Sequence, residues 1–239
     1  YEFPKAEVFM RPDRKEQAKV ICEEHKDKFL IAHLGWGLFE ISWSLRGFEN
    51  ILMDAAMYPD FYDEMLDKIM NLYLAFVEFT VDLPVDAIMF GDDWGDQRNV
   101  ILGPDLWRQF LKPRWAKIYD AVHAGGKLVI THCCGSIASI MPDVIEIGLD
   151  ILESVQPEAE GMSPYELKKE YGDKLTFWGG LGTQSTIPYG TPESIKAEVH
   201  RLCTEVGKGG GYILAPAKPL QPETSAENAA AVVEAFTEQ

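Results

Sequence analysis

Six short apolar runs recur along the chain, and each is bounded by glycine, aspartate or proline. They are FLIAHLGWG (29–37), AIMFGDDWG (87–95), KLVITHCCG (127–135), DILESVQP (150–157), LTFWGGLG (175–182) and YILAPAKPL (212–220). Continuous apolar runs of this length are typical of strands that are buried on both faces, as in parallel sheets. The pattern therefore predicts six buried strands.

Helical patterns with start and stop signals separate these runs. A capping residue before a proline or an acidic first turn marks three helix starts, at Ser163, Thr191 and Ser225. Glycines mark the expected helix ends, at positions 125–126, 172 and 207–211. Two further helical patterns fill residues 38–84 and meet near Tyr58. Strands that alternate with helices, without hairpin signals, predict parallel βα units, here in a single domain over residues 1–239.

An open doubly wound sheet and a closed barrel both fit this alternation. The open sheet would favour a Gly-x-Gly-x-x-Gly turn after its first strand, and the first run is not followed by one. In a (β/α)8 TIM barrel, by contrast, the active site is built from residues at the carboxyl ends of several strands. Such residues end the predicted strands here: His33 and Trp36, Asp92 and Asp93, His132 and Cys134, Glu153 and Gln156, Gln184, and Lys218. We therefore expect a (β/α)8 barrel and, because six units are visible, that its first one or two βα units are missing from this chain.

Composition and charge narrow the class of protein. The 239 residues are 46% hydrophobic, with no apolar run long enough to span a membrane and no signal-peptide pattern at the N-terminus. The net charge of −16, with scattered lysines and arginines, argues against a nucleic-acid partner. Four cysteines, two of them adjacent, are typical of a cytosolic chain without disulfides. We expect a soluble cytoplasmic protein that acts on a small molecule.

The stretch VITHCCGSI (129–137) places metal-binding residue types at the end of one predicted strand. Because side chains alternate along a strand, His132 and Cys134 point to one side and Cys133 points to the other. Imidazole and thiolate bind zinc at ~2.0–2.3 Å, and Glu153, at the end of the next strand, could add an oxygen. The alternative is a histidine that donates to a neighbouring carboxylate beside a buried, inert thiol. The spacing alone leaves both open.

Other strand-end residues also have a functional and a structural interpretation. One of Asp92 and Asp93 must face the barrel mouth, where it could bind an NH-rich ligand or transfer a proton, or simply cap the next helix. Lys218 could bind an anionic tail or be a solvated loop lysine. Trp36 could line a flat ligand or plug the core. His33 is expected to be a core histidine.

The order of the segments resembles the uroporphyrinogen decarboxylase superfamily, which also contains cobalamin-dependent methyltransferases. The matching segments include GLFEISWSLRGFENILMDAAMYPDF, DAIMFGDDWGDQRNVILGPDLWRQFLKPRWAKIYDAVHAGGKLVITHCCGSI, FWGGLGTQ, GTPESIKAEV and GGGYILAPAKPLQPETSAENAAAVVEAF. The resemblance covers nearly all of the chain from about residue 29. It implies a (β/α)8 barrel whose first two βα units would precede the first strand of this chain.

The two branches of this superfamily imply different chemistry. The decarboxylases use no cofactor and hold pyrrole NH groups with an aspartate, whose region Asp92 or Asp93 matches. The methyltransferases bind zinc through His-x-Cys and a later cysteine, and the zinc activates a thiol that accepts a methyl group from a corrinoid protein. His132 and Cys134 match the first two of these ligands. The third does not match, because the sequence reads APAKPL, with Lys218 near the expected place.

Three functions follow from the residues and the resemblance. The leading hypothesis is a methyltransferase that moves a methyl group between a corrinoid protein and a thiol or folate-type acceptor. The alternatives are a cofactor-free decarboxylase of a porphyrinogen-like polycarboxylate, and a non-catalytic corrinoid or small-ligand binder. Unpaired edges of an incomplete barrel also make a homo-oligomer an open alternative. The leading hypothesis assigns catalysis to Asp92, Asp93, His132 and Cys134, zinc binding to His132, Cys134 and Glu153, and ligand or cofactor binding to Trp36, Glu153, Gln156, Gln184 and Lys218.

Overall fold

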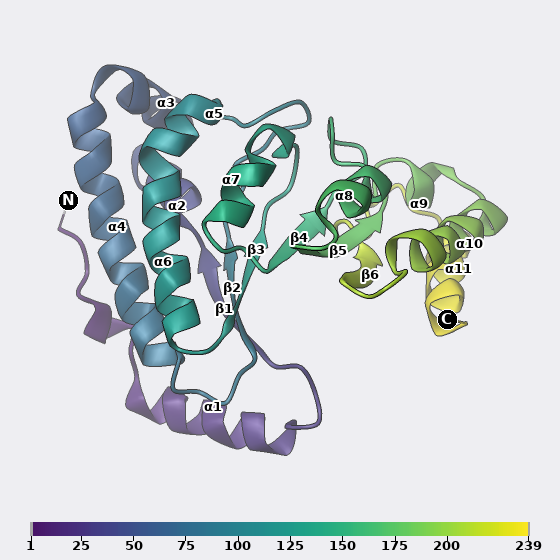
Figure 1. Ribbon diagram of the computed structural model, residues 1–239, viewed down its shortest axis with the longest axis horizontal. Helices are drawn as coiled ribbons and strands as arrows, with labels where there is room; N and C mark the ends of the chain where they lie inside the picture. The colour runs from purple at the N-terminus through teal and green to yellow at the C-terminus, as the bar shows by residue number, and fades with distance from the viewer. Residues whose placement is uncertain (1, 239) are drawn as a thin grey trace. The chain divides into compact units, whose positions relative to one another are not determined.

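The computed structural model describes residues 2–238, which divide into two compact units (Figure 1). The first unit comprises the described residues up to Asp92, together with Leu102–Thr131 and Pro142–Leu149. The second comprises Asp93–Ile101, His132–Met141 and the described residues from Asp150 onward. Both units consist of helices and parallel strands. That residues 1–239 form a single domain stays a prediction.

Three parallel strands and most of the long helices belong to the first unit. Ile31 lies opposite Ala87 where β1 pairs with β2, and the Leu128 N–H donates to the Asp86 carbonyl (3.0 Å) where β3 begins beside β2. The strands are β1 (Ile31–Trp36), β2 (Ala87–Gly91) and β3 (Leu128–His132, its last residue in the second unit). The helices are α1 (Pro12–Glu24), α2 (Leu38–Arg46), α3 (Phe48–Met57), α4 (Pro59–Thr80), α5 (Pro104–Leu106), α6 (Lys112–Ala124) and α7 (Met141–Glu146, its first residue in the second unit).

The second unit repeats the alternation with shorter helices. β4 pairs with β5, and β5 with β6, in parallel register, with Phe177 opposite Tyr212. The Cys133 N–H donates to the Glu153 carbonyl (2.5 Å), so the end of β3 lies beside β4 in this unit. The strands are β4 (Ile151–Val155), β5 (Thr176–Leu181) and β6 (Tyr212–Pro216). The helices are α8 (Pro164–Tyr171), α9 (Thr186–Tyr189), α10 (Pro192–Arg201) and α11 (Ala226–Thr237), and α10 and α11 lie side by side in Figure 1.

All six predicted strands are present, and the helix signals locate the helices between them. The Thr191 side chain accepts from the Ser194 N–H (3.3 Å) and the Ser194 hydroxyl accepts from the Thr191 N–H (2.8 Å), which caps α10. The Ser225 side chain caps α11 by accepting from the Asn228 N–H (3.1 Å). α8 begins after Ser163 as predicted, although this serine makes no side-chain capping bond. Helices α6 and α8 end at the predicted glycines.

The stretch 38–84 differs from the prediction by one helix. Three helices fill it, because Gly47 separates α2 from α3. Gly47 has φ 93°, a conformation that residues with a Cβ rarely adopt. The predicted break near Tyr58 is confirmed. Most of the aromatic and Met side chains of α4 lie in or against the core as expected, with Tyr62, Met65, Met70 and Tyr73 buried, but Phe61 is exposed.

The first unit is built around buried aromatic side chains from β2 and α6. The Phe90 ring packs edge-on against Trp115 (5.3 Å between ring centroids), and both are fully buried. α4 runs beside α6 (Figure 1), and Arg114 on α6 bonds to Asp63 and Asp67 on α4 (2.8 and 2.7 Å). Burial of each side chain of this size stabilises the fold by about 3 kcal/mol. This aromatic layer therefore holds the carboxyl end of β2 in place.

Two further expectations concern single features. His33 is exposed on β1, so its assignment to the core was wrong. Among the described residues, no helix combines the length and apolar character needed to cross a bilayer.

Candidate functional site

Three side chains with metal-binding atoms meet at the end of β3 in the second unit. The His132 Nε2 atom lies 3.2 Å from the Cys134 Sγ and 3.7 Å from an Asp93 carboxylate oxygen. One donor atom from each of these residues lies within 4.8 Å of the other two. The Cys134 N–H donates to the same Asp93 oxygen (2.7 Å), which fixes the carboxylate beside the thiol. The predicted convergence of His132 and Cys134 therefore has Asp93 as its third member.

Glu153, at the end of β4, contacts the opposite side of the imidazole. Its carboxylate lies against Nδ1 of His132, so Nε2 is the ring atom that faces Cys134. Burial of the ring opposes protonation, but the contacts with the Cys134 thiol and the Glu153 carboxylate outweigh it and raise the pKa of His132 to about 10. A carboxylate on the second nitrogen orients a ligating histidine and increases its basicity. In this arrangement Glu153 orients the histidine.

Cys133 points away from the cluster, as the alternation of side chains predicts. It is fully buried, and its Sγ accepts from the Trp94 N–H (3.2 Å). Burial raises the pKa of the Cys133 thiol well above its usual range. Cys133 is therefore a neutral core thiol, whereas Cys134 is the sulfur of the site.

The loop after β3 is held by backbone contacts that tolerate no side chain. Gly135 has φ 79°, and a Cβ there would lie 2.5 Å from the Gly95 carbonyl oxygen. The Gly135 N–H donates to the Gln156 side-chain oxygen (3.2 Å), and the Gln156 amide lies 3.4 Å from the Gln97 side chain. Gln156 is buried, so its observed contacts hold this loop in place.

The remaining predicted site residues of the second unit, Gln184 and Lys218, differ in burial. Gln184 is exposed, and its N–H donates to Glu158 (2.8 Å), which also accepts from the Ser185 hydroxyl (2.8 Å). Sequence reasoning missed Glu158, although its place after β4 resembles that of the residues it did select. Lys218 is half-buried and lines a cavity of about 380 Å³ together with His132 and Glu153.

Two of the predicted site residues belong to the first unit. Asp92 is fully buried and accepts from the N–H groups of Phe39 (3.0 Å) and Glu40 (2.9 Å) and from the Trp115 indole (3.1 Å). It caps the first turn of α2, a helix that precedes it in the chain, and not the next helix that the structural alternative named. Trp36 is 61% exposed at the end of β1.

The chain is similar to several proteins of known sequence or structure. The family model "Uroporphyrinogen decarboxylase (URO-D)" matches residues 18–239. A methylcobamide:CoM methyltransferase MtaA from Methanosarcina barkeri is 29% identical over 182 residues, covering 75% of this chain and 49% of the relative. A uroporphyrinogen decarboxylase from Coxiella burnetii (strain Dugway 5J108-111) is 25% identical over 180 residues, covering 74% of this chain and 47% of the relative. A methyltransferase from Methanosarcina mazei has a similar structure, with a TM-score of 0.72 and 25% identity, over 94% of this chain and 63% of that chain.

These matches settle the fold and the family. The chain spans about half the length of the curated relatives it matches. The parallel β/α architecture, part of a (β/α)8 barrel, is confirmed by the structural neighbour. The relatives of this chain include methyltransferases and decarboxylases, which are all enzymes. The chain belongs to the uroporphyrinogen decarboxylase (URO-D) family.

Proposed function

We propose that this chain forms the acceptor side of a methyltransferase, which moves a methyl group from a corrinoid protein to a small thiol. The observation that carries the proposal is the cluster of Asp93, His132 and Cys134, whose donor atoms lie within 4.8 Å of one another. The methyltransferase relative supports it, since its name describes transfer from a methylcobamide to CoM.

The donor set fits a zinc ion. Imidazole nitrogen, thiolate sulfur and carboxylate oxygen are the three ligand types that zinc prefers in proteins, and three protein ligands leave a position open for a substrate. Asp93, His132 and Cys134 would hold the ion, with one atom of each type. A zinc ion bound there would supply Lewis acidity that favours the thiolate form of an acceptor thiol at neutral pH.

The chain's own residues prepare the site for this role. Glu153 holds Nδ1 of the imidazole and thereby directs Nε2 to the same point as the Cys134 sulfur. The Cys134 N–H neutralises part of the Asp93 charge and keeps its carboxylate from turning away. The cavity of about 380 Å³ beside His132 has room for a small acceptor. Pro216 and Pro219, whose rings restrict the backbone, line it.

The position of Asp92 favours this function over decarboxylation. A decarboxylase would need a carboxylate free to accept bonds from its substrate's NH groups. Asp92 already accepts three bonds from Phe39, Glu40 and Trp115 inside the first unit. Asp93 is turned to Cys134. Neither aspartate therefore supports the decarboxylase alternative.

The test is methyl transfer from methylcobalamin to mercaptoethanol, followed by the absorbance of the cob(I)alamin that the transfer leaves behind. The full chain, supplied with zinc, is compared with His132→Ala and Cys134→Ser. We expect both substitutions to abolish the transfer, and Cys203→Ser, a cysteine on the π-helical turn Leu202–Val206, to leave it unchanged. Full activity in both site variants, or turnover of uroporphyrinogen instead of the thiol, would contradict the proposal.

A further inference from the structure

Lys218 has an unusual position for a lysine. It follows β6 in the segment Ala217-Lys218-Pro219 and is half-buried in the wall of the cavity that His132 and Glu153 also line. No carboxylate, carbonyl or other polar partner for its ammonium group is found among the described residues. The ammonium group keeps some exposure to solvent, so a ligand in this cavity can reach it.

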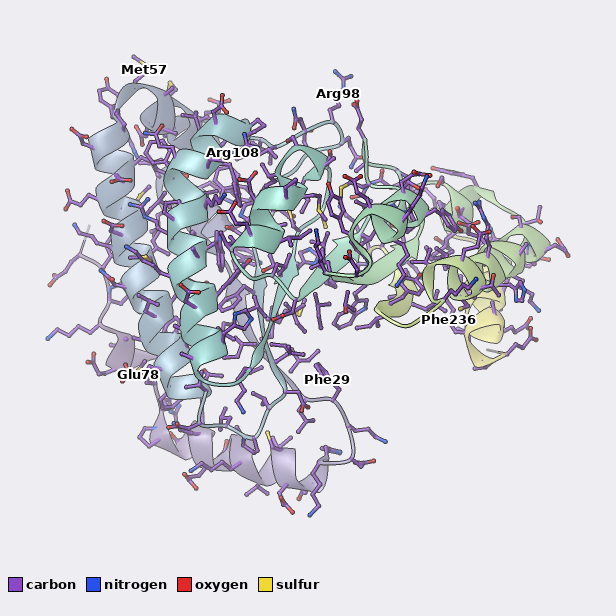
Figure 2. All side chains as sticks on the ribbon, viewed as in Figure 1. Phe29, Met57, Glu78, Arg98, Arg108 and Phe236 are labelled. Atoms are coloured by element: carbon purple, nitrogen blue, oxygen red, sulfur yellow. The ribbon has the colours of Figure 1, made fainter. Side chains whose placement is uncertain are left out.

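Other cations of the second unit do not share this combination. Lys196 pairs with Glu234 (2.8 Å) and Arg201 with Glu205 (2.9 Å), and Lys168 donates to the Gly210 carbonyl (2.5 Å). Apart from Lys218, the cations of this unit without a described partner are all exposed: Arg98, Lys169, Lys174 and Lys208. Figure 2 shows Arg98 projecting into solvent. Lys218 is thus the half-buried and unpaired cation of this unit, within the residues that the structure describes.

The charges around the cavity leave the lysine free to meet a ligand. Glu153 is the carboxylate that lines this cavity, and it is engaged by the His132 imidazole. Among the described residues, the ion pairs of Glu153 include the imidazole and none joins it to Lys218. The other lining residues, Pro216, Ala217, Pro219 and Leu220, are apolar. The cavity therefore offers one uncompensated positive charge in a chain whose net charge is −16.

We propose that Lys218 is a specificity residue of this site, which selects a ligand bearing a carboxylate or sulfonate group over a neutral ligand of the same shape. The inference rests on the proposed function for the ligand's role as acceptor, but anion recognition by Lys218 can be measured without any methyl transfer. The ion pair would supply the partner that the ammonium lacks in the free protein. Attraction in a partly desolvated cavity is stronger than at an exposed surface.

The test is a binding comparison between mercaptopropionate and mercaptopropanol, two thiols of equal length of which one is charged. Isothermal titration calorimetry with the full chain, with and without zinc, gives the ratio of the two dissociation constants. We expect about tenfold tighter binding of the charged thiol, as for one partly buried ion pair. Lys218→Met should reduce the ratio to about one, and Lys218→Arg should retain most of it. Lys208→Met, at an exposed lysine of the same unit, should change nothing.

A third probe, propionate, separates this inference from the proposed function. Binding of propionate that depends on Lys218, without a gain from the thiol group in the zinc-loaded protein, would keep the anion site and contradict the thiol acceptor. Binding of both thiols through Cys134 and His132 with equal strength would keep the thiol acceptor and contradict the anion site. An unchanged ratio in Lys218→Met, or no binding of any probe at millimolar concentration, would overturn the inference.

Discussion

Replacement of Asp92 by asparagine separates a structural from a catalytic role for this residue. The buried Asp92 carboxylate accepts from the N–H groups of Phe39 (3.0 Å) and Glu40 (2.9 Å) and from the Trp115 indole (3.1 Å). An amide has one acceptor oxygen, so Asp92→Asn can keep the bonds to the first turn of α2. Its NH2 group must then face the Trp115 N–H, which leaves two buried donors opposed.

The magnitude follows from these three bonds. Hydrogen bonds to a charged acceptor contribute about 1.5–3 kcal/mol each and neutral ones about 0.5–1.5, so the two retained bonds weaken by about 1 kcal/mol each. The opposed donors cost a further ~1–3 kcal/mol, and the lower desolvation cost of an amide offsets part of the total. We expect Asp92→Asn to lower the free energy of unfolding of the first unit by about 2–4 kcal/mol.

Urea unfolding followed by far-ultraviolet circular dichroism measures this change. The matched control is Asp105→Asn, whose side chain is fully exposed and which should alter stability by less than about 0.5 kcal/mol. Methyl transfer by the folded Asp92→Asn protein should stay close to wild type. Unchanged stability together with lost activity would refute the structural assignment of Asp92.

Three further predictions follow from single contacts. Glu153→Gln should weaken zinc binding about 10–100-fold in a competition with a chromophoric chelator, because it removes the carboxylate that orients the imidazole; a complete loss equal to that of a ligand substitution would contradict this role. Burial raises the pKa of Asp143, but bonds from Arg108 (3.0 Å) and Lys112 (2.7 Å) lower it below its usual value. The stabilising effect of the ionised Asp143 is therefore full above the unfolded-state pKa of about 4 and is lost as the pH falls through the folded-state value. In urea unfolding, the difference in stability between the wild type and Asp143→Asn should therefore disappear in acid. A difference that stayed constant with pH would contradict the ion pairs. Gly135→Ala should destabilise the second unit by about 1–3 kcal/mol in thermal unfolding, because φ is 79° and the new Cβ would clash with backbone; an unchanged melting temperature would contradict the tight loop.

The sequence predicts the elements of this fold well because each apolar run ends at a turn-forming residue. The prediction of burial holds for β2 and β4, whereas β1 and β6 contain no buried residue. The caps at Thr191 and Ser225 act within three residues of the chain. The division of 38–84 was missed at Gly47, because a glycine inside a helical pattern is compatible with either a continuous or a broken helix.

The sequence predicts which side chains lie at the ends of β2, β3 and β4, but not which of them contact one another: Asp93, and not the predicted Glu153, joins His132 and Cys134. Strand alternation is local, so it places His132 and Cys134 on one side and Cys133 on the other. Which of Asp92 and Asp93 joins them depends on how the chain turns after β2, and which nitrogen of His132 meets Glu153 depends on how His132 packs against the end of β4. These are tertiary features that spacing does not encode. The half-burial of Lys218 likewise depends on how the segment after β6 lies beside His132 and Glu153, with which it lines one cavity.

The zinc content of the purified, untagged chain tests the central claim most directly. Elemental mass spectrometry on the wild type and on Cys134→Ser, with Cys203→Ser as the control, measures metal per chain without any assumption about substrates. The account predicts about one zinc per chain in the wild type and in the control, and loss of zinc in Cys134→Ser. No zinc in the wild type after zinc loading, or equal zinc in Cys134→Ser, would contradict it.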